Sequence, residues 1–414
     1  MTGAMMSDMP TRGVAFRIKG ELPPEAKFLL EDFRLAINNT IRAGLRTRVT
    51  SRNALCKLLY KDLREEHPRI YAKHLVSAFE VAGNILKNYR RKLRTRYASR
   101  APYVRRLMMK AENQAYKLDR ENGIVDLPIR AWCHVKLELE VSDYHRRYLD
   151  DRSLRLGSLT VLPDRVIVAF RKEAPRPYAP ESALSLDTNE RSMDGIIVMG
   201  DGARAVKVDY QDITVIQQRR HDRRKRLQKK KAHDRRTSKR LCKREGQREH
   251  HRIEYRLHQV ANSVLSFAEN QKSAVVLEDL RGFRPRRNRE LNRRLTLWPR
   301  RKLHQIIEYK AQWKGIPVVK VDPRNSSRTC PICGRIQDSR MGTEFECECG
   351  WHLDRHINAS LNLLQTAISK GLEVAGGLRF NPGAFQHDVM MILYEPAMAA
   401  RSEPNGTSCI GAVT

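Results

Sequence analysis

The chain has 414 residues and a formal net charge of +32, and 41% of its residues are hydrophobic. This composition excludes an intrinsically disordered protein, and the length allows two or three domains. Because so large a positive charge repels itself unless a polyanion binds, we expect nucleic acid as the partner. We expect no membrane partner, since no long apolar span or lipid-facing amphipathic helix is visible.

The first third of the chain is predicted to be helical and basic. Residues 1–10 lack the apolar core of a signal peptide, so we expect an intracellular, cytoplasmic protein of the prokaryotic type. A strand-like run at 13–19 precedes residues 25–116, where apolar residues recur at three- and four-residue steps. The polar face of residues 77–98 is rich in arginine and lysine. A solvated surface is one explanation, but charges of nearly one sign favour a face that binds a nucleic-acid backbone.

The region from residue 123 to residue 173 is predicted to be rich in β-strands. Apolar and polar residues alternate at 135–141, and two further apolar runs are separated by Pro163 and Asp164, a turn signal. The strand at 13–19 is a candidate to join them. Residues 174–182 contain three prolines and mark a domain boundary.

The second half opens with a strand at 183–187 and a run at 195–200, which together indicate a hairpin. A long helix-compatible stretch follows from Asp212 to about Asn270. About half of the residues between Arg219 and Arg256 are arginine or lysine, and few acids lie four positions away, so we expect a nucleic-acid surface rather than a solvated helix. The elements predicted after it are an apolar strand at 274–280, a second basic segment at 281–301, a helix at 302–314 and a buried strand at 315–322.

Three acidic residues stand where a metal-dependent enzyme needs them. Asp187 and Glu278 lie at the ends of apolar strands, and Asp354 lies at the start of a helix-like segment. Carboxylates that converge at one edge of a sheet can hold two divalent cations about 3.5–4 Å apart, and oxygen ligands suit Mg²⁺ or Mn²⁺. Any one of these acids alone can be explained as a helix cap or a surface charge. The combination of all three points more specifically to a metal site. The nearby Asp194 and Asp279 are assigned to a turn or the surface.

Four cysteines lie within twenty residues: Cys330, Cys333, Cys347 and Cys349. In a reducing compartment such a cluster favours a metal over disulfides, and four thiolates predict a structural Zn²⁺ site. The second pair is one residue shorter than the usual knuckle, and His352 is an alternative to one thiolate, although the four-cysteine set is preferred. So short an insert has almost no core, so we expect the metal to fold it.

The motifs SLDTNERSMDG, VVLEDLRGF and KVDPRNSSRTCPICG…FECECGWHLDRHINASLNLL, in this order, resemble the TnpB family. This family comprises nucleases encoded by insertion sequences and is related to the compact type V CRISPR effectors. The resemblance covers residues 183–366 well, whereas the first 175 residues match only in architecture. Of the motifs, the last one is specific.

The resemblance implies an RNA-guided DNA endonuclease, with guide RNA and DNA as partners and one RuvC-like cutting site. Asp187 and Glu278 fall on the first two catalytic positions. For the third, the family commonly shows Asp-Arg-Asp before x-Asn-Ala, and here the residues are Asp354, Arg355 and His356. We predict Asp354 as the third ligand, with His356 as support.

The resemblance also implies an α+β multidomain fold, in which an RNase H-like (RuvC) α/β domain carries an inserted zinc ribbon. The expected parts are a first wedge strand (1–24), a helical recognition lobe (25–122), a β wedge domain (123–175), a linker (176–182), the nuclease domain (183–325), the zinc ribbon (326–352), the third nuclease motif (353–370) and a C-terminal tail (371–414).

Two other functions remain open at this point. One is a guide-directed DNA-binding protein whose nuclease site is inactive. The other is a zinc-ribbon DNA-binding protein that uses no guide. A transposase that joins strands would use the same fold and metals, but the TnpB resemblance disfavours it.

Overall fold

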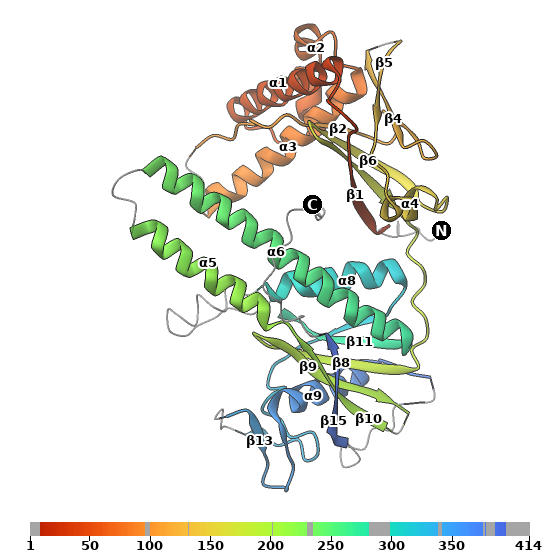
Figure 1. Ribbon diagram of the computed structural model, residues 1–414, viewed down its shortest axis with the longest axis vertical. Coiled ribbons are helices and arrows are strands. Elements are labelled where there is room, and N and C mark those ends of the chain that lie inside the picture. Colours follow the sequence, from red (N-terminus) through yellow and green to blue (C-terminus); the bar gives the residue numbers. More distant parts are fainter. Residues whose placement is uncertain are drawn as a thin grey trace. The chain divides into compact units, whose positions relative to one another are not determined.

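The computed structural model describes residues 9–95, 100–130, 132–200, 202–229, 235–280, 299–337, 342–375, 377 and 386–394. The chain divides between Glu173 and Ala174 into two compact units, and this boundary coincides with the start of the proline-rich segment 174–182. Figure 1 shows the helices and strands of each unit, and each unit has its own buried core. Among the described helices, none combines the length and the hydropathy that crossing a lipid bilayer requires.

The helices of the first unit are α1 (Pro24–Thr47), α2 (Arg52–Glu66), α3 (Ala72–Arg94) and the short α4 (Asp143–Leu149). The buried face of α1 includes Leu30, Phe33 and Ile37, which recur at three- and four-residue steps. Ser51 caps α2 by accepting a hydrogen bond from the backbone of Ala54. The predicted helical character is therefore confirmed as far as Arg94.

The strands of the first unit form two antiparallel sheets. The larger has the order β1-β7-β6-β2 and the smaller the order β3-β4-β5. Their bounds are β1 (Thr11–Arg17), β2 (Met109–Ala111), β3 (Lys117–Asp119), β4 (Ile124–Arg130), β5 (Cys133–Glu138), β6 (Arg155–Leu162) and β7 (Arg165–Arg171). Because β1 pairs with β7 along its whole length, the strand near the start of the chain joins this sheet, as expected.

One part of the helical prediction is wrong. Residues 109–111 form β2, which pairs with β6, and residues 117–119 form β3, which pairs with β4. Met109 and Ala111 are buried and Lys110 between them is not, which is the alternation of a strand. Pro102, just before these strands, also disfavours a helix that continues through this region.

The second unit is built on a six-stranded sheet with the order β12-β11-β8-β9-β10-β15. Its strands are β8 (Ser182–Thr188), β9 (Ser192–Met199), β10 (Gly202–Asp209), β11 (Ser273–Glu278), β12 (Val318–Val321) and β15 (Gln386–Tyr394). The strands β8, β9 and β10 are successively antiparallel, whereas β11 pairs parallel with both β8 and β12. The carboxyl ends of β8 and β11 therefore meet at one edge of the sheet.

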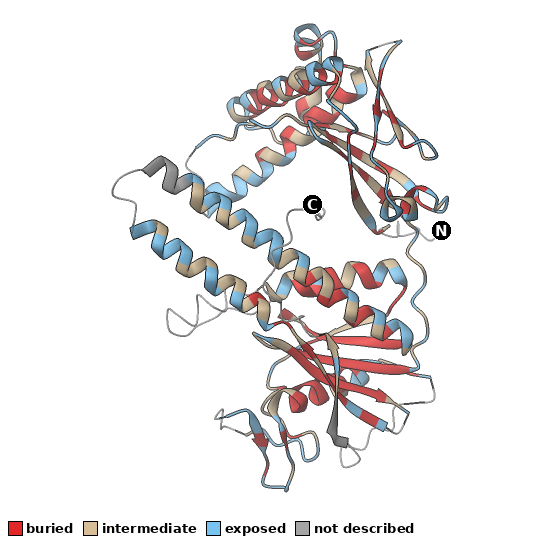
Figure 2. Cartoon of the chain, viewed as in Figure 1, coloured by how far each residue is buried: buried red, intermediate tan, exposed pale blue. Residues whose placement is uncertain are grey.

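Helices cover both faces of this sheet. One core cluster joins β8, β10 and β11 to α6 (Arg235–Asn270) and α8 (Arg300–Lys314), and another joins the opposite face to α9 (Arg355–Ser369). The strands β8 and β11 are buried at every position (Figure 2). Such strands need a layer on each side, which explains their continuous apolar sequence.

The helical character predicted from Asp212 to Asn270 is confirmed in α5 (Gln211–Lys229) and in α6. Two strands of the second unit were not predicted. The prediction overlooked β10, and it also overlooked β15, which pairs parallel with β10. Residues 281–298 of the second basic segment and residues 395–414 of the tail lie outside the described residues.

Candidate active site and metal centre

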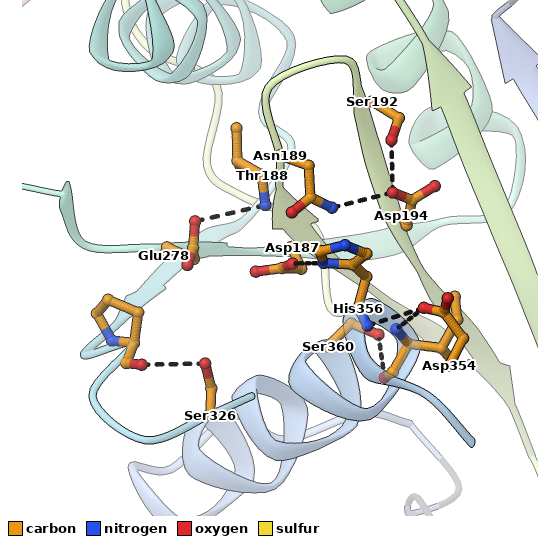
Figure 3. Close-up of polar contacts among 12 residues, drawn as sticks. Asp187, Thr188, Asn189, Ser192, Asp194, Glu278, Ser326, Asp354, His356 and Ser360 are labelled. Carbon is orange, nitrogen blue, oxygen red and sulfur yellow. Dashed lines mark hydrogen bonds and ion pairs between the residues drawn. The ribbon is translucent and has the colours of Figure 1, made fainter. Parts of the chain in front are cut away.

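Two of the predicted acids lie side by side at the edge of the six-stranded sheet. Asp187 is the penultimate residue of β8 and Glu278 is the last residue of β11. The two strands pair in parallel up to Leu277 and Leu186, so both acids leave the sheet at the same edge (Figure 3). Each residue is only 8% exposed. The fold thus brings two carboxylates from distant parts of the chain into one buried location.

The environment of Glu278 is unfavourable for its negative charge. Burial, together with the neighbouring charge of Asp187, raises the pKa of Glu278 to about 8. The backbone N–H of Thr188 lies 3.4 Å from Oε2 of Glu278, and Arg300 acts on the same carboxylate, but both only partly offset the effect. The negative charges of these two buried carboxylates are only partly offset by neighbouring groups. Such a pair is suited to bind a cation, because a cation favours the ionised form of both carboxylates.

His356 stands next to Asp187. It lies in the first turn of α9, and its Nδ1 donates a hydrogen bond to Oδ2 of Asp187 over 3.0 Å. Burial alone lowers the pKa of His356, but the hydrogen bond and charge of Asp187 raise it above its usual value. The structure therefore forms a row of three side chains: Glu278, Asp187 and His356.

Asp354 lies immediately before α9, two residues from His356. It is the N-cap of α9, and its Oδ1 accepts hydrogen bonds from the backbone N–H groups of His356 (2.8 Å) and Ile357 (3.1 Å). Among the described residues, the possible ligand atoms of Asp187 and Glu278 do not all lie within 4.8 Å of one another together with those of Asp354, and the same is true together with those of His356. The structure therefore places Asp187 and Glu278 at one edge of the sheet, with His356 in contact with Asp187.

A buried histidine joins the two strands that carry the acids. His304, from α8, is 2% exposed, and its Nε2 lies 2.8 Å from the hydroxyl of Thr188. Burial lowers the pKa of His304 to about 4, so the ring is neutral, and it also interacts with the backbone carbonyl of Glu278. His304 thus links the end of β8 to the end of β11. This residue was not predicted from the sequence, because a histidine within a helix carries no local signal of such a contact.

Asp194 is a further acid of this site that the sequence analysis assigned to a turn or the surface. It lies directly opposite Asp187 in the β8–β9 ladder, so both side chains point to the face that α9 covers. It is 9% exposed. Pairing residues across the predicted hairpin, starting from its turn, would have placed Asp194 opposite Asp187.

A cavity of about 460 Å³ lies beside His356, which lines it. Acidic and basic side chains line it together: Glu190, Arg191, Asp194, Lys207, Asp354 and His356. Figure 3 shows the imidazole of His356 between the carboxylate of Asp187 on one side and those of Asp194 and Asp354 on the other. The cavity and the acid pair are therefore adjacent parts of one site.

The four clustered cysteines form a compact set. The Sγ atoms of Cys330 and Cys349 are 3.5 Å apart, as are those of Cys333 and Cys347, and all four lie within 4.8 Å of one another. Thiolates that bind one tetrahedral metal at 2.3 Å are separated by about 3.8 Å, so this arrangement fits a metal ion. The backbone N–H of Cys349 lowers the pKa of the Cys347 thiol to about 6, which favours the thiolate that a metal requires.

His352 does not take part in this cluster. It lies on β14 (His352–Asp354), which pairs with β13 (Glu344–Glu346). Its Nε2 contacts Oε2 of Glu344 at 3.0 Å and Oε1 of Glu346 at 3.7 Å. The geometry thus favours the four-cysteine set over the alternative in which His352 replaces a thiolate.

Basic side chains are concentrated on three helices. On α6, Glu245 contacts Arg223 at 3.2 Å and Glu249 contacts Arg220, so acids neutralise a part of the charge on α5. The basic residues that stay exposed on the described parts of these helices are Lys73, Lys87, Arg90, Arg91, Lys92 and Arg94 on α3, Arg219, Arg223, Arg224, Lys225, Arg226 and Lys229 on α5, and Arg240, Lys243, Arg244, Arg248 and Arg252 on α6. Such surfaces suit a polyanion.

Two family models match the chain. The Cas12f1-like TNB domain model matches residues 301–363, which include α8, the cysteine cluster and the first half of α9. A model described as the uncharacterized protein MJ0013 family matches residues 29–126. The first match therefore covers most of the third motif and the metal cluster.

Among curated proteins, the chain is 28% identical over 246 residues to a TnpB-like protein of Methanocaldococcus jannaschii, which covers 57% of this chain and 88% of that protein. It is 30% identical over 107 residues to a CRISPR-associated endodeoxyribonuclease Cas12f1 from an uncultured archaeon, covering 23% of this chain but only 20% of that protein. Among solved structures, a Cas12f1–sgRNA–target DNA complex gives a TM-score of 0.54 at 13% identity, covering 86% of this chain and 98% of the other. This last likeness concerns the fold.

Proposed function

This chain belongs to the TnpB family, which is related to the compact type V CRISPR effectors, and from that premise we propose that it is an RNA-guided DNA endonuclease. It would cut DNA by metal-dependent hydrolysis at a single RuvC-like site, in association with an insertion sequence. Guide RNA and target DNA are the proposed partners. The net charge of +32 and the exposed basic helices support binding to both.

The observation that carries this proposal is the row formed by Glu278, Asp187 and His356 at the edge of the sheet. The second unit has three antiparallel strands followed by two that are parallel to the first, which is the arrangement expected of an RNase H-like domain. The acids lie at the ends of its first and fourth strands in chain order. We therefore propose that the second unit contains the RuvC-like nuclease domain.

In the proposed reaction, Asp187 and Glu278 hold Mg²⁺ or Mn²⁺ and His356 takes the place of the third ligand. The bound cations would activate water and stabilise the leaving 3′ oxygen. Two cations in such a site lie about 3.5–4 Å apart, so their ligands need not surround a single point. A row of ligands is compatible with this arrangement. His304 and the backbone of Thr188 hold the two carboxylates in place. Asp354, predicted earlier as the third ligand, would instead fix the start of α9 and thus the position of His356.

The remaining parts take the roles expected from the resemblance. We propose that α1, α2 and α3 form the recognition lobe, that the sheets of the first unit form the wedge domain, and that the cysteine cluster is a zinc ribbon with one structural Zn²⁺. Within the described residues of the ribbon, the small core cluster consists of Cys330, Phe345 and Cys347, so the metal would supply most of the ribbon's stability.

A second function is favoured by one observation. Position 356 carries an imidazole where a third carboxylate is usual, so a guide-directed DNA-binding protein that does not cut is the alternative. The two functions share the guide and the DNA target. They differ only in whether the row of Glu278, Asp187 and His356 supports hydrolysis.

The guide is tested by purifying the protein from its host under low salt and sequencing the nucleic acid that accompanies it. We expect one discrete RNA, part of which pairs with DNA that the protein then retains in a binding assay. Purification without RNA, combined with DNA binding that is insensitive to added RNA, would instead indicate a zinc-ribbon DNA-binding protein without a guide.

A further inference from the structure

The hairpin of β4 and β5 carries a tryptophan at its tip (Figure 1). Arg130 ends β4 and pairs with Cys133, which begins β5, so two residues connect the strands and Trp132 is the second of them. The side chain of Trp132 is 100% exposed, whereas the next most exposed large apolar side chain among the described residues, Phe28, is 65% exposed. A side chain that buries no surface adds nothing to the hydrophobic stabilisation of the fold, so we expect another role for it.

The backbone of Trp132 adopts a conformation that disfavours a large side chain. Its φ is +63°, in the left-handed region, where any residue with a Cβ meets a steric penalty. Glycine, asparagine and aspartate are the usual residues in two-residue hairpin turns that need a positive φ. Among the other described non-glycine residues with positive φ, Arg48 and Lys272 follow helices and Asn325 is of a favoured type. A strained residue that the fold itself does not need is typical of a functional position.

The hairpin below this tip is held firmly. Leu127 and Leu137 are each 1% exposed, so the inner face of the hairpin belongs to the core of the first unit. The imidazole of His74, which is fully buried on α3, donates a hydrogen bond from Nε2 to the backbone carbonyl of Pro128 over 2.9 Å. Trp132 therefore stands on a fixed support, and its rigid ring loses little conformational entropy when it binds a partner.

The residues beside Trp132 favour a nucleic acid as that partner. Arg130 and His134, on the two strands next to the tip, are exposed, and Nδ1 of His134 lies 2.9 Å from Oδ1 of Asp126. A protein partner would be expected to meet a cluster of apolar side chains, since the anchors of protein interfaces lie within well-packed patches. A single aromatic ring together with an arginine instead suits a nucleotide, because its base offers a flat π-face and its phosphate a negative charge.

We propose that Trp132 stacks on an unpaired nucleobase, either of RNA or of a separated DNA strand. The proposal rests on the proposed function for its nucleic-acid partner, but not on the acids at the sheet edge. Bases inside a double helix are covered by their neighbours on both faces, so an intact duplex does not accept the ring. Since every base has a π-face, Trp132 fixes the position of one nucleotide and does not read its identity.

The test measures nucleic-acid binding by the full-length protein after its own nucleic acid has been removed in high salt. The probes are a single-stranded RNA and a single-stranded DNA of mixed sequence, and a relaxed circular duplex, which has no ends. The variants are Trp132→Gly, which relaxes the backbone, and Trp132→Phe, which retains an aromatic ring. The matched control is Tyr144→Ala, because Tyr144 is an aromatic residue of α4 in the same unit and is 53% exposed.

We expect Trp132→Gly to weaken the binding of at least one single-stranded probe by about fivefold or more, and that of the circular duplex by less than about twofold. The probe that is affected identifies RNA, DNA or both as the source of the base. Trp132→Phe should retain most of the affinity, but binding should quench less of its tryptophan emission than in the unmodified protein. Normal binding of both single strands by Trp132→Gly, an equal loss with the circular duplex, or an equal loss in Tyr144→Ala would overturn the proposal.

The melting temperature separates this role from a structural one. Glycine adopts a φ of +63° without a steric penalty, so Trp132→Gly should melt at a temperature at least as high as the unmodified protein while it binds more weakly. A clearly lower melting temperature would show that the ring stabilises the fold, and it would also overturn the proposal.

Failure of this inference and failure of the proposed function are distinguishable. Guided cutting by the unmodified protein, combined with normal binding of single strands by Trp132→Gly, would remove the stacking contact alone. Weaker binding by Trp132→Gly of a protein that carries no RNA and does not cut would retain the stacking contact and remove the guided nuclease.

Discussion

The imidazole of His356 donates from Nδ1 to Oδ2 of Asp187 over 3.0 Å, across 169 positions of the sequence. This contact places a histidine, and not the third carboxylate that the family resemblance suggests, next to the acids at the sheet edge. Asp354, two residues earlier, has its carboxylate directed at the N-terminus of its own helix. The proposed active site is therefore asymmetric, with two carboxylates on one side and an imidazole on the other.

We predict that position 356 controls cutting. His356→Ala should slow DNA cleavage by more than about tenfold, because the site loses a ligand, whereas His356→Asp should cut at least as fast as the unmodified protein in Mg²⁺. Single-turnover cleavage rates measure both. Asp354→Asn is the informative comparison, since asparagine caps helices as well as aspartate does. If that variant folds normally but no longer cuts, Asp354 returns to the set of metal ligands.

We predict that Glu278 destabilises the metal-free protein at neutral pH. Its pKa is raised from 4.5 to about 8, so between these values the unfolded chain releases a proton that the folded chain keeps. The free energy of unfolding then falls as pH rises through this window, by at most about 1.4 kcal/mol per pH unit. Glu278→Gln should remove this loss, so its melting temperature should exceed that of the unmodified protein at pH 8 and equal it near pH 4.

Denaturation scans in EDTA between pH 4 and pH 9 provide the measurement. Added Mg²⁺ should raise the melting temperature of the unmodified protein at pH 8 and leave that of Glu278→Gln unchanged, because binding to the folded state stabilises it. Parallel pH profiles of the two proteins in EDTA would be incompatible with the assigned environment of Glu278.

We predict that the cysteine cluster holds one zinc ion per chain. Cys330→Ser should remove that ion, because three thiolates and a hydroxyl bind Zn²⁺ much more weakly than four thiolates. Elemental analysis measures the metal, and limited proteolysis reports whether residues 326–354 remain folded. Cys56→Ser is the control, since Cys56 lies on α2 and does not belong to the cluster. A full zinc content in Cys330→Ser would contradict the assignment.

We predict that the exposed basic residues of α5 contact a nucleic-acid backbone. Replacing Arg224, Lys225 and Arg226 by glutamine should weaken RNA binding and lower the slope of log K against log salt by about 2 to 3, since each phosphate contact contributes about 0.7–0.9. Binding titrations at several salt concentrations give the slope. The control replaces three lysines that are exposed elsewhere, namely Lys19, Lys117 and Lys136. Because it removes the same charge, an equal change in slope would show that net charge, and not α5, is responsible.

The parts that the sequence predicts well are those with local signals. The apolar runs that end in Asp187 and Glu278 indicate buried strands, and parallel pairing then places both acids at one edge. The paired cysteines indicate their cluster through spacing alone. In both cases a short segment contains the whole pattern.

The parts that the sequence does not predict depend on orientation or on distant pairing. Asp354 and His356 are two residues apart, but the first is an N-cap that faces its own helix and the second faces the sheet. Asp194 becomes part of the site only through its register with Asp187. The strand β15 pairs with β10 across more than 170 positions of the sequence, so no local sequence pattern indicates this pairing.

The most direct test of the central claim is cleavage of a supercoiled plasmid that carries a sequence matching the accompanying RNA. We predict Mg²⁺-dependent cutting by the unmodified protein, and a loss of more than about a hundredfold in Asp187→Asn and Glu278→Gln, which should still bind the plasmid. Asp322→Asn, an exposed acid that follows β12 at the same sheet edge, should cut normally. Cutting that persists in Asp187→Asn and Glu278→Gln would contradict the account, because the row of Glu278, Asp187 and His356 would then not be the site of hydrolysis.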